Sequence, residues 1–279
     1  MSQKAYFKLT SEQFIPYRNL TEVAFKLVSF LCFAMDETVA LKNLVGKSTE
    51  ILDGNENEVP IKVFYHSIPF ESREPKKGWH QMLFTYDVIR ENAELVINNW
   101  LAAYETVDPA LNLYFATKTG AQKYTDGKFL ALAQGLETYH RRTSSETLMG
   151  QSEFESLVQQ IIQGCPEEHS DWLKGRLMHG NEINLGKRIK AIIEPFKDKL
   201  GNNRERSKLL RNIVNTRNYL THYSDSLENH ALNGAELWKL CQKMEAIFQL
   251  HFLKVIGFNE AEIASVIENC HFLNQKLSR

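Results

Sequence analysis

Arg217, Asn218 and His222 lie within one six-residue run near the C-terminal end of the sequence, RNYLTH. Histidine transfers protons near neutral pH, and arginine is a permanent cation whose planar fork matches a phosphate. Together they have the chemistry to cleave RNA without a metal. His222 would transfer protons to or from the 2′-hydroxyl or the leaving 5′-oxygen, and Arg217 would stabilise charge on the phosphoryl oxygens. Asn218 would orient the imidazole or contact the phosphate.

A helix predicted at 204–222 must position these three side chains. Its apolar residues recur every three or four positions, as expected of one helix face. They are Leu210, Ile213, Val214 and Leu220. Arg217 falls inside this stripe, and an unpaired buried guanidinium is costly. Arg217 therefore either pairs with a buried acid or points into a cleft or a partner interface.

The spacing within the run restricts how its side chains meet. Asn218 and His222 are four residues apart and share a helix face. Arg217 and His222 are five apart, so they diverge by about 140° on a straight helix. Both reach one substrate only if the helix ends near Thr221, or if two copies of the domain place these faces across a shared cleft.

An arginine followed by a histidine at this distance is weak evidence by itself, because chance supplies roughly one such pair in a chain of this composition. Arg73 and His80 form a comparable pair. Pro75 and Gly78 lie between them, so that pair is predicted to lie in a loop that does not fix its geometry. The helix and its charge distinguish the pair at 217 and 222.

Positive charge is concentrated just before the run. The chain has a formal net charge of −1, yet the segment 187–217 carries ten cations and three acids, which leaves −8 for the rest. A local basic strip fits docking of a polyanion, although solvated helix faces are the plainer alternative. The residues predicted to bind RNA are Lys187, Arg188, Arg204, Lys208 and Arg211.

A second candidate segment lies on a helix predicted at 128–143. Leu132, Ala133, Leu136 and His140 follow one face, with Glu137 beside them. A histidine on such a face is more often a core residue than a catalytic one. Glu137 and Arg141, four residues apart, form an ion pair on a helix surface in the plainer interpretation.

The whole sequence of 279 residues, 43% hydrophobic and 24% charged, is long enough for two cores. The longest apolar stretch, Val23–Met35, is too short to span a bilayer, and the N-terminus lacks a targeting leader, so a cytoplasmic protein without membrane contact is expected. Its four cysteines are predicted to be reduced core thiols. Neither they nor the histidines have zinc-site spacing, so no metal and no cofactor is predicted.

The predicted architecture is mainly α. Residues 1–120 mix a helix at 17–37, β-like runs at 39–45 and 59–66 around an Asp-Gly turn, and a helix at 91–104. Residues 121–279 are predicted to be an all-helical bundle. Its helices are expected at 128–143, 151–163, 168–178, 186–199 with a kink near Pro195, 204–222, 234–257 and 259–276.

The two candidate segments together resemble a known family. The run RNYLTH is similar to the Arg-(four to six residues)-His signature of HEPN domains, with the asparagine found in many active members. Residues 129–141, FLALAQGLETYHR, resemble the first helix of ApeA-like HEPN domains, in which an Ala-Leu-Glu type core precedes a His-Arg pair. The resemblance covers about 125–275. Upstream, residues 1–120 look like the tail of a longer N-terminal domain.

This resemblance implies a metal-independent ribonuclease of bacterial anti-phage defence with an abortive-infection outcome and tRNA as the substrate class. It implies a homodimer with one composite cleft, a phage-derived trigger or a regulatory partner protein, and supporting positions near the cleft for Glu137, His140 and Arg141. Two alternatives stay open. One is a non-catalytic module for RNA binding or dimerisation, and the other is a toxin-like effector held inactive by a partner nucleotidyltransferase.

Overall fold

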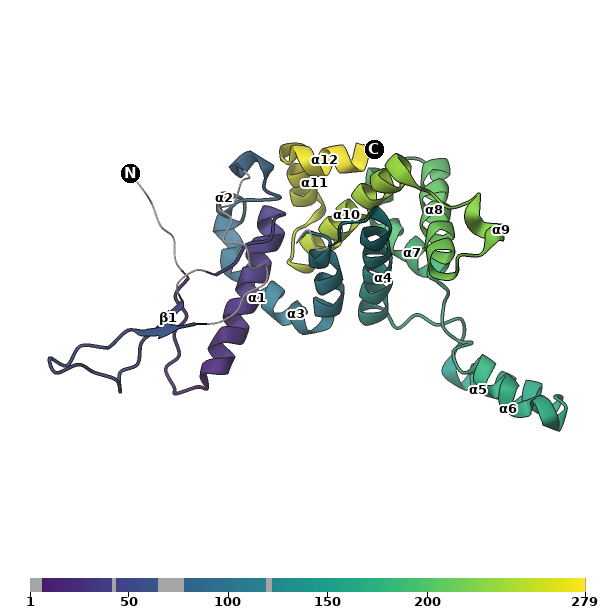
Figure 1. Ribbon diagram of the computed structural model, residues 1–279, viewed down its shortest axis with the longest axis horizontal. Coiled ribbons are helices and arrows are strands. Elements are labelled where there is room, and N and C mark those ends of the chain that lie inside the picture. The colour runs from purple at the N-terminus through teal and green to yellow at the C-terminus, as the bar shows by residue number, and fades with distance from the viewer. Residues whose placement is uncertain (1–6, 42–43, 65–77, 119–121, 279) are drawn as a thin grey trace. The chain divides into compact units, whose positions relative to one another are not determined.

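The computed structural model describes residues 7–41, 44–64, 78–118 and 122–278 (Figure 1). These residues are mainly helical and include one small two-stranded sheet near the N-terminus, which confirms the predicted fold class. They fall into two compact units. Unit 1 takes its described residues from Met1–Glu105, Phe115–Ala121 and Gln249–Lys276, and unit 2 from Thr106–Tyr114, Gln122–Phe248 and Leu277–Arg279.

Unit 1 begins with the predicted long helix, α1, at Tyr17–Met35. The two β-like runs form short antiparallel strands, β1 at Leu44–Gly46 and β2 at Ile61–Val63. A turn joins them as predicted, because a carboxylate oxygen of Asp53 accepts hydrogen bonds from the backbone N–H groups of Asn55 and Asn57. Parts of both predicted runs, at 42–43 and 65–66, lie outside the described residues.

The next helix of the chain is longer than its sequence predicts. α3 runs from Ala93 to Ala116 and continues through Pro109, where the prediction had ended it at 104. A proline inside a helix removes only one backbone donor, and the eleven other residues from 105 to 116 continue the helix. Short helical turns precede it, at Trp79–Gln81 (η1), Tyr86–Ile89 (α2) and Arg90–Asn92 (η2).

Aromatic side chains form the core of unit 1. Phe33 of α1 stacks on Trp100 of α3 at 5.8 Å between ring centroids and meets Phe252 edge-on at 5.6 Å. Phe84 packs against Phe258 at 5.3 Å. These rings are almost completely buried, and their burial is the main force that stabilises this unit.

The C-terminal helices of the chain differ in one respect from the prediction. The single helix expected at 259–276 is two helices, α11 at Glu260–Asn269 and α12 at His271–Ser278, because Cys270 has an extended backbone. The predicted start of α11 is confirmed: Asn259 caps it, and Gly257 before it has a φ of 100°. A side chain at that φ would be strained.

Unit 2 is a helical bundle, and most of its helices lie where the sequence places them. Residues Gln249–Lys276, which the prediction included in the bundle, belong to unit 1. One four-residue helix, α9, was not predicted, and the kink at Pro195 is a change from α-helix to a 3₁₀ helix. The elements are α4 at Thr125–Thr143, α5 at Gln151–Gln163, α6 at Glu167–Leu177, α7 at Leu185–Ile193, η3 at Glu194–Lys199, α8 at Asn203–His222, α9 at Asp225–Glu228 and α10 at Gly234–Val255.

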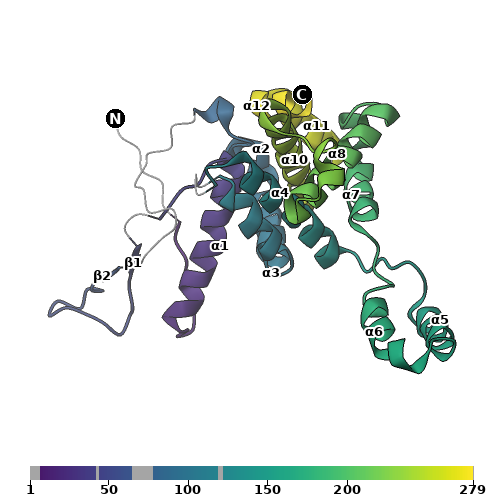
Figure 2. The ribbon, with the colours of Figure 1, turned by 45° about the vertical axis from the view of Figure 1, so that its right-hand side comes forward.

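Helices α4, α7 and α8 pack against one another and form the centre of unit 2 (Figure 2). Leu132, Ile189 and Ile213, one from each helix, are fully buried. α10 joins this core through Phe248. Gly135 of α4 permits the contact, because a Cβ atom at this position would lie 2.7 Å from the Phe248 ring. Both α4 and α7 thus hold α8 in place by packing against it.

A helical hairpin made of α5 and α6 extends from the bundle (Figures 1 and 2). Both helices are described in full, and neither contains a buried residue. At the base, Thr147 forms an isolated β-bridge with Glu182. The side chain of Asn181 accepts a hydrogen bond from the backbone N–H of Met149 and donates one to its carbonyl, at 3.0 and 3.1 Å. The hairpin is thus anchored where its two ends meet.

The cysteines are free thiols. Cys32, Cys241 and Cys270 are buried as predicted, whereas Cys165 is partly exposed. Burial raises the pKa of Cys32 to about 11 and that of Cys241 to about 12, so both stay protonated at neutral pH. Among the helices of the described ranges, none is both long and apolar enough to cross a bilayer. In the same ranges, no three His, Cys, Asp or Glu residues are grouped to hold a metal ion.

Candidate functional site

The candidate site is built on α8, whose two ends are well defined. At the start, the side chain of Asn202 accepts hydrogen bonds from the backbone N–H groups of Arg204 and Glu205, and Glu205 accepts one from the backbone of Asn202. At the other end, Tyr223 has a left-handed backbone with φ of 48° and stops the helix. His222 is therefore the last helical residue, as the helix predicted at 204–222 has it.

The buried face of α8 differs slightly from the predicted one. Leu209, Ile213, Thr216 and Leu220 are buried, whereas Leu210 and Val214 are only partly so. The buried face includes Thr216 because its hydroxyl oxygen has a partner in the interior. This oxygen accepts a hydrogen bond of 3.0 Å from the backbone N–H of Leu232. Periodicity of apolar residues cannot reveal a buried threonine.

Arg217 lies at the edge of the buried face and pairs with an acid, one of the alternatives left open by the sequence. Its guanidinium is 3.8 Å from the carboxylate of Glu137 on α4, and 34% of the arginine side chain is exposed. It also donates a hydrogen bond of 3.4 Å to the side-chain oxygen of Asn218. The structure therefore brings together Arg217, Asn218 and the supporting candidate Glu137.

Glu137 is part of a network of charged residues between α4 and α7. It accepts hydrogen bonds of 3.0 and 3.2 Å from Arg141, which confirms the predicted pair. Arg141 also donates to Glu182, and Arg188 donates to the same carboxylate at 3.4 Å. The hydrogen bond from Arg141 lowers the pKa of Glu182, so this carboxylate stays ionised.

His140 lies at the buried end of this network. Its side chain is almost inaccessible, as the core interpretation of this residue predicts. A guanidinium has no acceptor, so in the 3.3 Å contact with Arg188 the Nδ1 atom of His140 accepts the hydrogen bond. Burial, and then the charge of Arg188, lower the pKa of His140. His140 is thus a neutral residue of the interior near neutral pH.

The prediction that Arg188 binds RNA is not supported by its position in the structure. It was predicted to bind RNA at the surface, but it is 4% exposed and is engaged with Glu182 and His140. Its place at the fourth position of α7 faces the core, whereas Lys187 next to it is exposed. A basic strip read from the sequence does not separate these two orientations.

His222 is on a different side of α8 from Arg217. In the described part of the chain, its side chain has no hydrogen bond or ion pair, and it is exposed. Five residues of helix separate the two, which corresponds to about 140° around the axis. Asn218 lies between them in angle. α8 ends directly after His222, and within the helix the two side chains point apart.

His222 instead continues a row of polar residues on α8. These residues recur at alternating steps of four and three, so they share one face of the helix. We call them the α8 stripe: Arg204, Lys208, Arg211, Asn215, Asn218 and His222. The predicted catalytic residues Asn218 and His222 and three of the five predicted RNA-binding residues belong to this one row.

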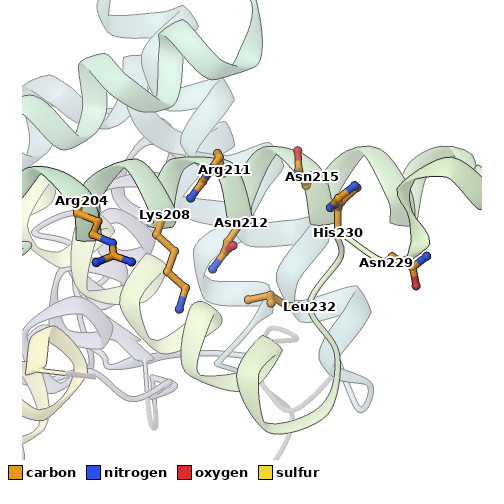
Figure 3. Close-up of a pocket in the computed structure, with 8 residues that line it drawn as sticks. All are labelled: Arg204, Lys208, Arg211, Asn212, Asn215, Asn229, His230 and Leu232. Atoms are coloured by element: carbon orange, nitrogen blue, oxygen red, sulfur yellow. The ribbon is translucent and has the colours of Figure 1, made fainter.

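A surface pocket of about 510 Å³ lies along the first half of the α8 stripe (Figure 3). One wall is α8, and the other is the segment that follows α9. Figure 3 shows Arg204 and Lys208 extending from the same side of the helix. The lining residues are Arg204, Lys208, Arg211, Asn212, Asn215, Asn229, His230 and Leu232.

Sequence reasoning missed several of these residues. Asn212 and Asn215 had a usable signal, because they lie at helical spacing from the cations of the same face. Asn229 and His230 had none, since they reach the pocket only through the fold. Glu182 was missed for the same reason: it is 41 residues from Arg141 and meets it across two elements.

Comparison with protein-family models gives two matches. Residues 130–262 match the family described as Apea-like HEPN, and residues 1–100 match ApeA N-terminal domain 1. Comparison with curated proteins and with solved structures gives no match. The first of these matches includes α8 and the charged network around Glu137.

The chain is therefore a HEPN-domain protein, with a helical domain of a family of metal-independent ribonucleases that often act in defence systems. More specifically, it joins an ApeA N-terminal domain to an Apea-like HEPN domain. This confirms the family resemblance drawn from the sequence. The expected domain limits at 1–120 and 121–279, and the roles of individual site residues, stay predictions.

Proposed function

We propose that this protein is a metal-independent endoribonuclease of anti-phage defence that acts through Arg217, Asn218 and His222, with tRNA as its substrate class. The observation that carries the proposal is the α8 stripe. It places the exposed His222 at the end of a row of cations, on the helix that also carries Arg217. RNA held by its phosphates along this row would arrive at a histidine able to transfer protons.

The proposed reaction is a transesterification within the RNA. The 2′-oxygen attacks the adjacent phosphorus, the bond from phosphorus to the 5′-oxygen breaks, and the products are a 2′,3′-cyclic phosphate and a 5′-hydroxyl. One proton leaves the 2′-hydroxyl and one reaches the 5′-oxygen, and His222 takes part in this transfer. Arg217 stabilises the charge that builds on the non-bridging oxygens. Asn218 contacts the phosphate or orients the groups beside it.

Glu137 has a supporting role in this proposal. Its carboxylate, 3.8 Å from the Arg217 guanidinium, limits the directions in which that side chain points. Arg141 binds the same carboxylate. The single negative charge of Glu137 is therefore shared between two guanidinium groups and does not fully neutralise Arg217. Exposed Lys187, Arg204, Lys208 and Arg211 would bind the RNA backbone.

The divergence of Arg217 and His222 favours a site made by two subunits. In a homodimer with two-fold symmetry, the α8 helices of both copies face each other across the axis. The arginine of one copy then meets the histidine of the other on a single phosphate. This arrangement requires no change in the orientation of either side chain, because His222 is exposed and Arg217 is partly exposed on each chain.

The first experiment is substitution of His222 by alanine. We expect purified wild-type protein to cleave a tRNA pool and the His222→Ala variant to lose at least about 100-fold in rate, the contribution typical of a general acid or base. EDTA should leave the wild-type rate unchanged. The matched control is His169→Ala, because His169 is an exposed histidine on α6, away from α8.

Equal cleavage by wild type and His222→Ala would remove His222 from the reaction. Tight RNA binding by both proteins without any cleavage, at every pH from about 6 to about 8, would favour the non-catalytic module. Cleavage that appears only after a partner nucleotidyltransferase is removed would favour the toxin-like effector.

A further inference from the structure

We propose that the pocket along the first half of the α8 stripe is a nucleotide subsite that binds a phosphate and its base several nucleotides away from the scissile bond. This inference rests on the proposed function for the position of the cut, but the binding itself is independent of catalysis. It assigns a role to Asn212, Asn215, Asn229 and His230, which the sequence did not predict.

Unpaired positive charge is the first observation. Within the described ranges, the side chains of Arg204, Lys208 and Arg211 form no ion pair or hydrogen bond. Neighbouring cations are engaged: Arg206 donates to the backbone carbonyl of Lys197 at 3.1 Å, and Lys239 pairs with Glu236 at 2.8 Å. No acid lines the pocket, although the charge of Lys208 contributes to the lowered pKa of Glu236, so the three cations together favour a bound anion.

The amides of the pocket suggest that its ligand is more than a simple anion. In the described structure, the side chains of Asn212, Asn215 and Asn229 have no hydrogen-bond partner. Each offers donors and an acceptor at a fixed spacing, the pattern that matches the edge of a base. Leu232 adds an apolar surface beside them. Cations for the phosphate and amides for the base fit a nucleotide unit.

The pocket wall is fixed to the helix. The backbone N–H of Leu232 donates to the buried hydroxyl of Thr216 on α8, at 3.0 Å. This bond ties the segment after α9 to α8, and Figure 3 shows His230 beside Asn215, at the end of the pocket away from Arg204. A preformed site loses less conformational entropy on binding than a mobile loop would.

The distance to His222 defines the ligand further. Arg211 and His222 are eleven residues apart on one helix face, which is about 16 Å along the axis. A free mononucleotide cannot occupy both places, whereas an RNA strand of several nucleotides reaches from one to the other. The predicted substrate is thus an RNA that extends well to one side of the cut.

The test is a series of RNA oligonucleotides with one cleavage position and flanks extended from about four to about sixteen nucleotides. We expect the wild-type rate to rise by at least about tenfold once the flank reaches the pocket. The Lys208→Ala/Arg211→Ala variant should lose this gain, so that its rate no longer rises with the length of the flank. The control variant Lys174→Ala/Arg176→Ala also removes one lysine and one arginine, but on the exposed helix α6, and it should behave as wild type.

Binding measured with RNA that carries a 2′-deoxy residue at the cut separates this inference from the proposed reaction. Affinity should fall more steeply with salt in the wild type than in Lys208→Ala/Arg211→Ala, with the logarithmic slope smaller by about two in the variant. Asn212→Ala/Asn215→Ala should keep the slope but lose preference among bases. This comparison holds whether or not His222 is catalytic.

Three results would overturn the inference. The first is an identical length profile in the wild type and in Lys208→Ala/Arg211→Ala, and the second is an identical salt slope. The third is saturable binding of a free mononucleotide such as AMP at the pocket, abolished by the same substitutions, while RNA binding is unchanged. That last result would assign the pocket to a small effector instead of the substrate.

Discussion

The buried histidine of α4 shows how a residue can belong to a site without reacting in it. His140 accepts a hydrogen bond from Arg188, which pairs with Glu182, which in turn binds Arg141. The chain of contacts ends at Glu137 and Arg217. A proton on His140 would place a second positive charge directly beside Arg188 in the interior, so the network favours the neutral imidazole.

This arrangement predicts a pH dependence of stability. The folded pKa of His140 is lowered from 6.5, so the unfolded chain binds more protons than the folded one as pH falls below that value. We expect the free energy of unfolding to decrease between about pH 7.5 and about pH 5.5, and to decrease less in His140→Gln. Urea unfolding at several pH values measures it.

The matched control for this prediction is His169→Gln, since His169 is exposed and should leave the pH profile as in the wild type. Glu146, 3.9 Å from the Nε2 atom, raises the pKa of His140 slightly and opposes the effect. Parallel profiles of wild type and His140→Gln would mean that the folded protein accommodates the charged imidazole without cost.

At the scale of elements, α8 has to present one polar face over twenty residues. Its mean composition is polar, so packing against α4 and α7 and the cap at Asn202 both contribute to its stability. The cap satisfies backbone N–H groups at the end where the pocket begins. A frayed first turn would move Arg204 and loosen that end of the stripe.

Asn202→Ala should therefore lower the free energy of unfolding by about 1 kcal/mol, the usual effect of losing an asparagine cap. Ser207→Ala on the same helix is the control, because Ser207 is exposed and alanine favours helix. Chemical unfolding of both variants beside the wild type gives the values. An unchanged midpoint for Asn202→Ala would show that packing alone holds the first turn.

The helices themselves were the most predictable feature, because apolar periodicity reports which face is buried. The sequence indicated seven helices beyond residue 120, and the structure differs mainly by the short α9 and the break at Cys270. α9 is only four residues long and has no period to detect. The break at Cys270 lacks a glycine or proline signal, so only tertiary packing explains it.

The candidate site was predictable only in part, and the reason is physical. Arg217, Asn218, His222 and the pair at Glu137 and Arg141 are local in sequence, so spacing and residue type reveal them. Contacts between α4, α7 and the segment after α9 depend on tertiary structure. The burial of Arg188, the place of Glu182 in the charged network and the place of His230 in the pocket follow from those contacts and from no local pattern.

At the scale of the molecule, the proposed site needs two chains. Arg217→Ala and His222→Ala should each be inactive alone. Co-expressed, they form mixed dimers in which the intact arginine and the intact histidine meet in one of the two sites. Random pairing then restores roughly a quarter of the wild-type rate. The purified mixed dimer, which has one intact site of two, should reach roughly half of the wild-type rate. Measuring cleavage by the mixture and by the purified mixed dimer tests both values.

The control for the mixed dimer is the double variant Arg217→Ala/His222→Ala co-expressed with wild type. If sites are shared between subunits, each such mixed dimer lacks an intact site. No recovery in the mixture of single variants would place both residues in one chain, and α8 would then have to unwind near Thr221 for them to meet on one phosphate.

The hairpin of α5 and α6 contributes no buried residue, and its two ends meet at the bridge between Thr147 and Glu182. The length of the segment between them is therefore uncoupled from the bundle, since its ends stay together whatever it contains. Evolution is therefore free to lengthen, shorten or exchange this arm without refolding the helical bundle that contains α8.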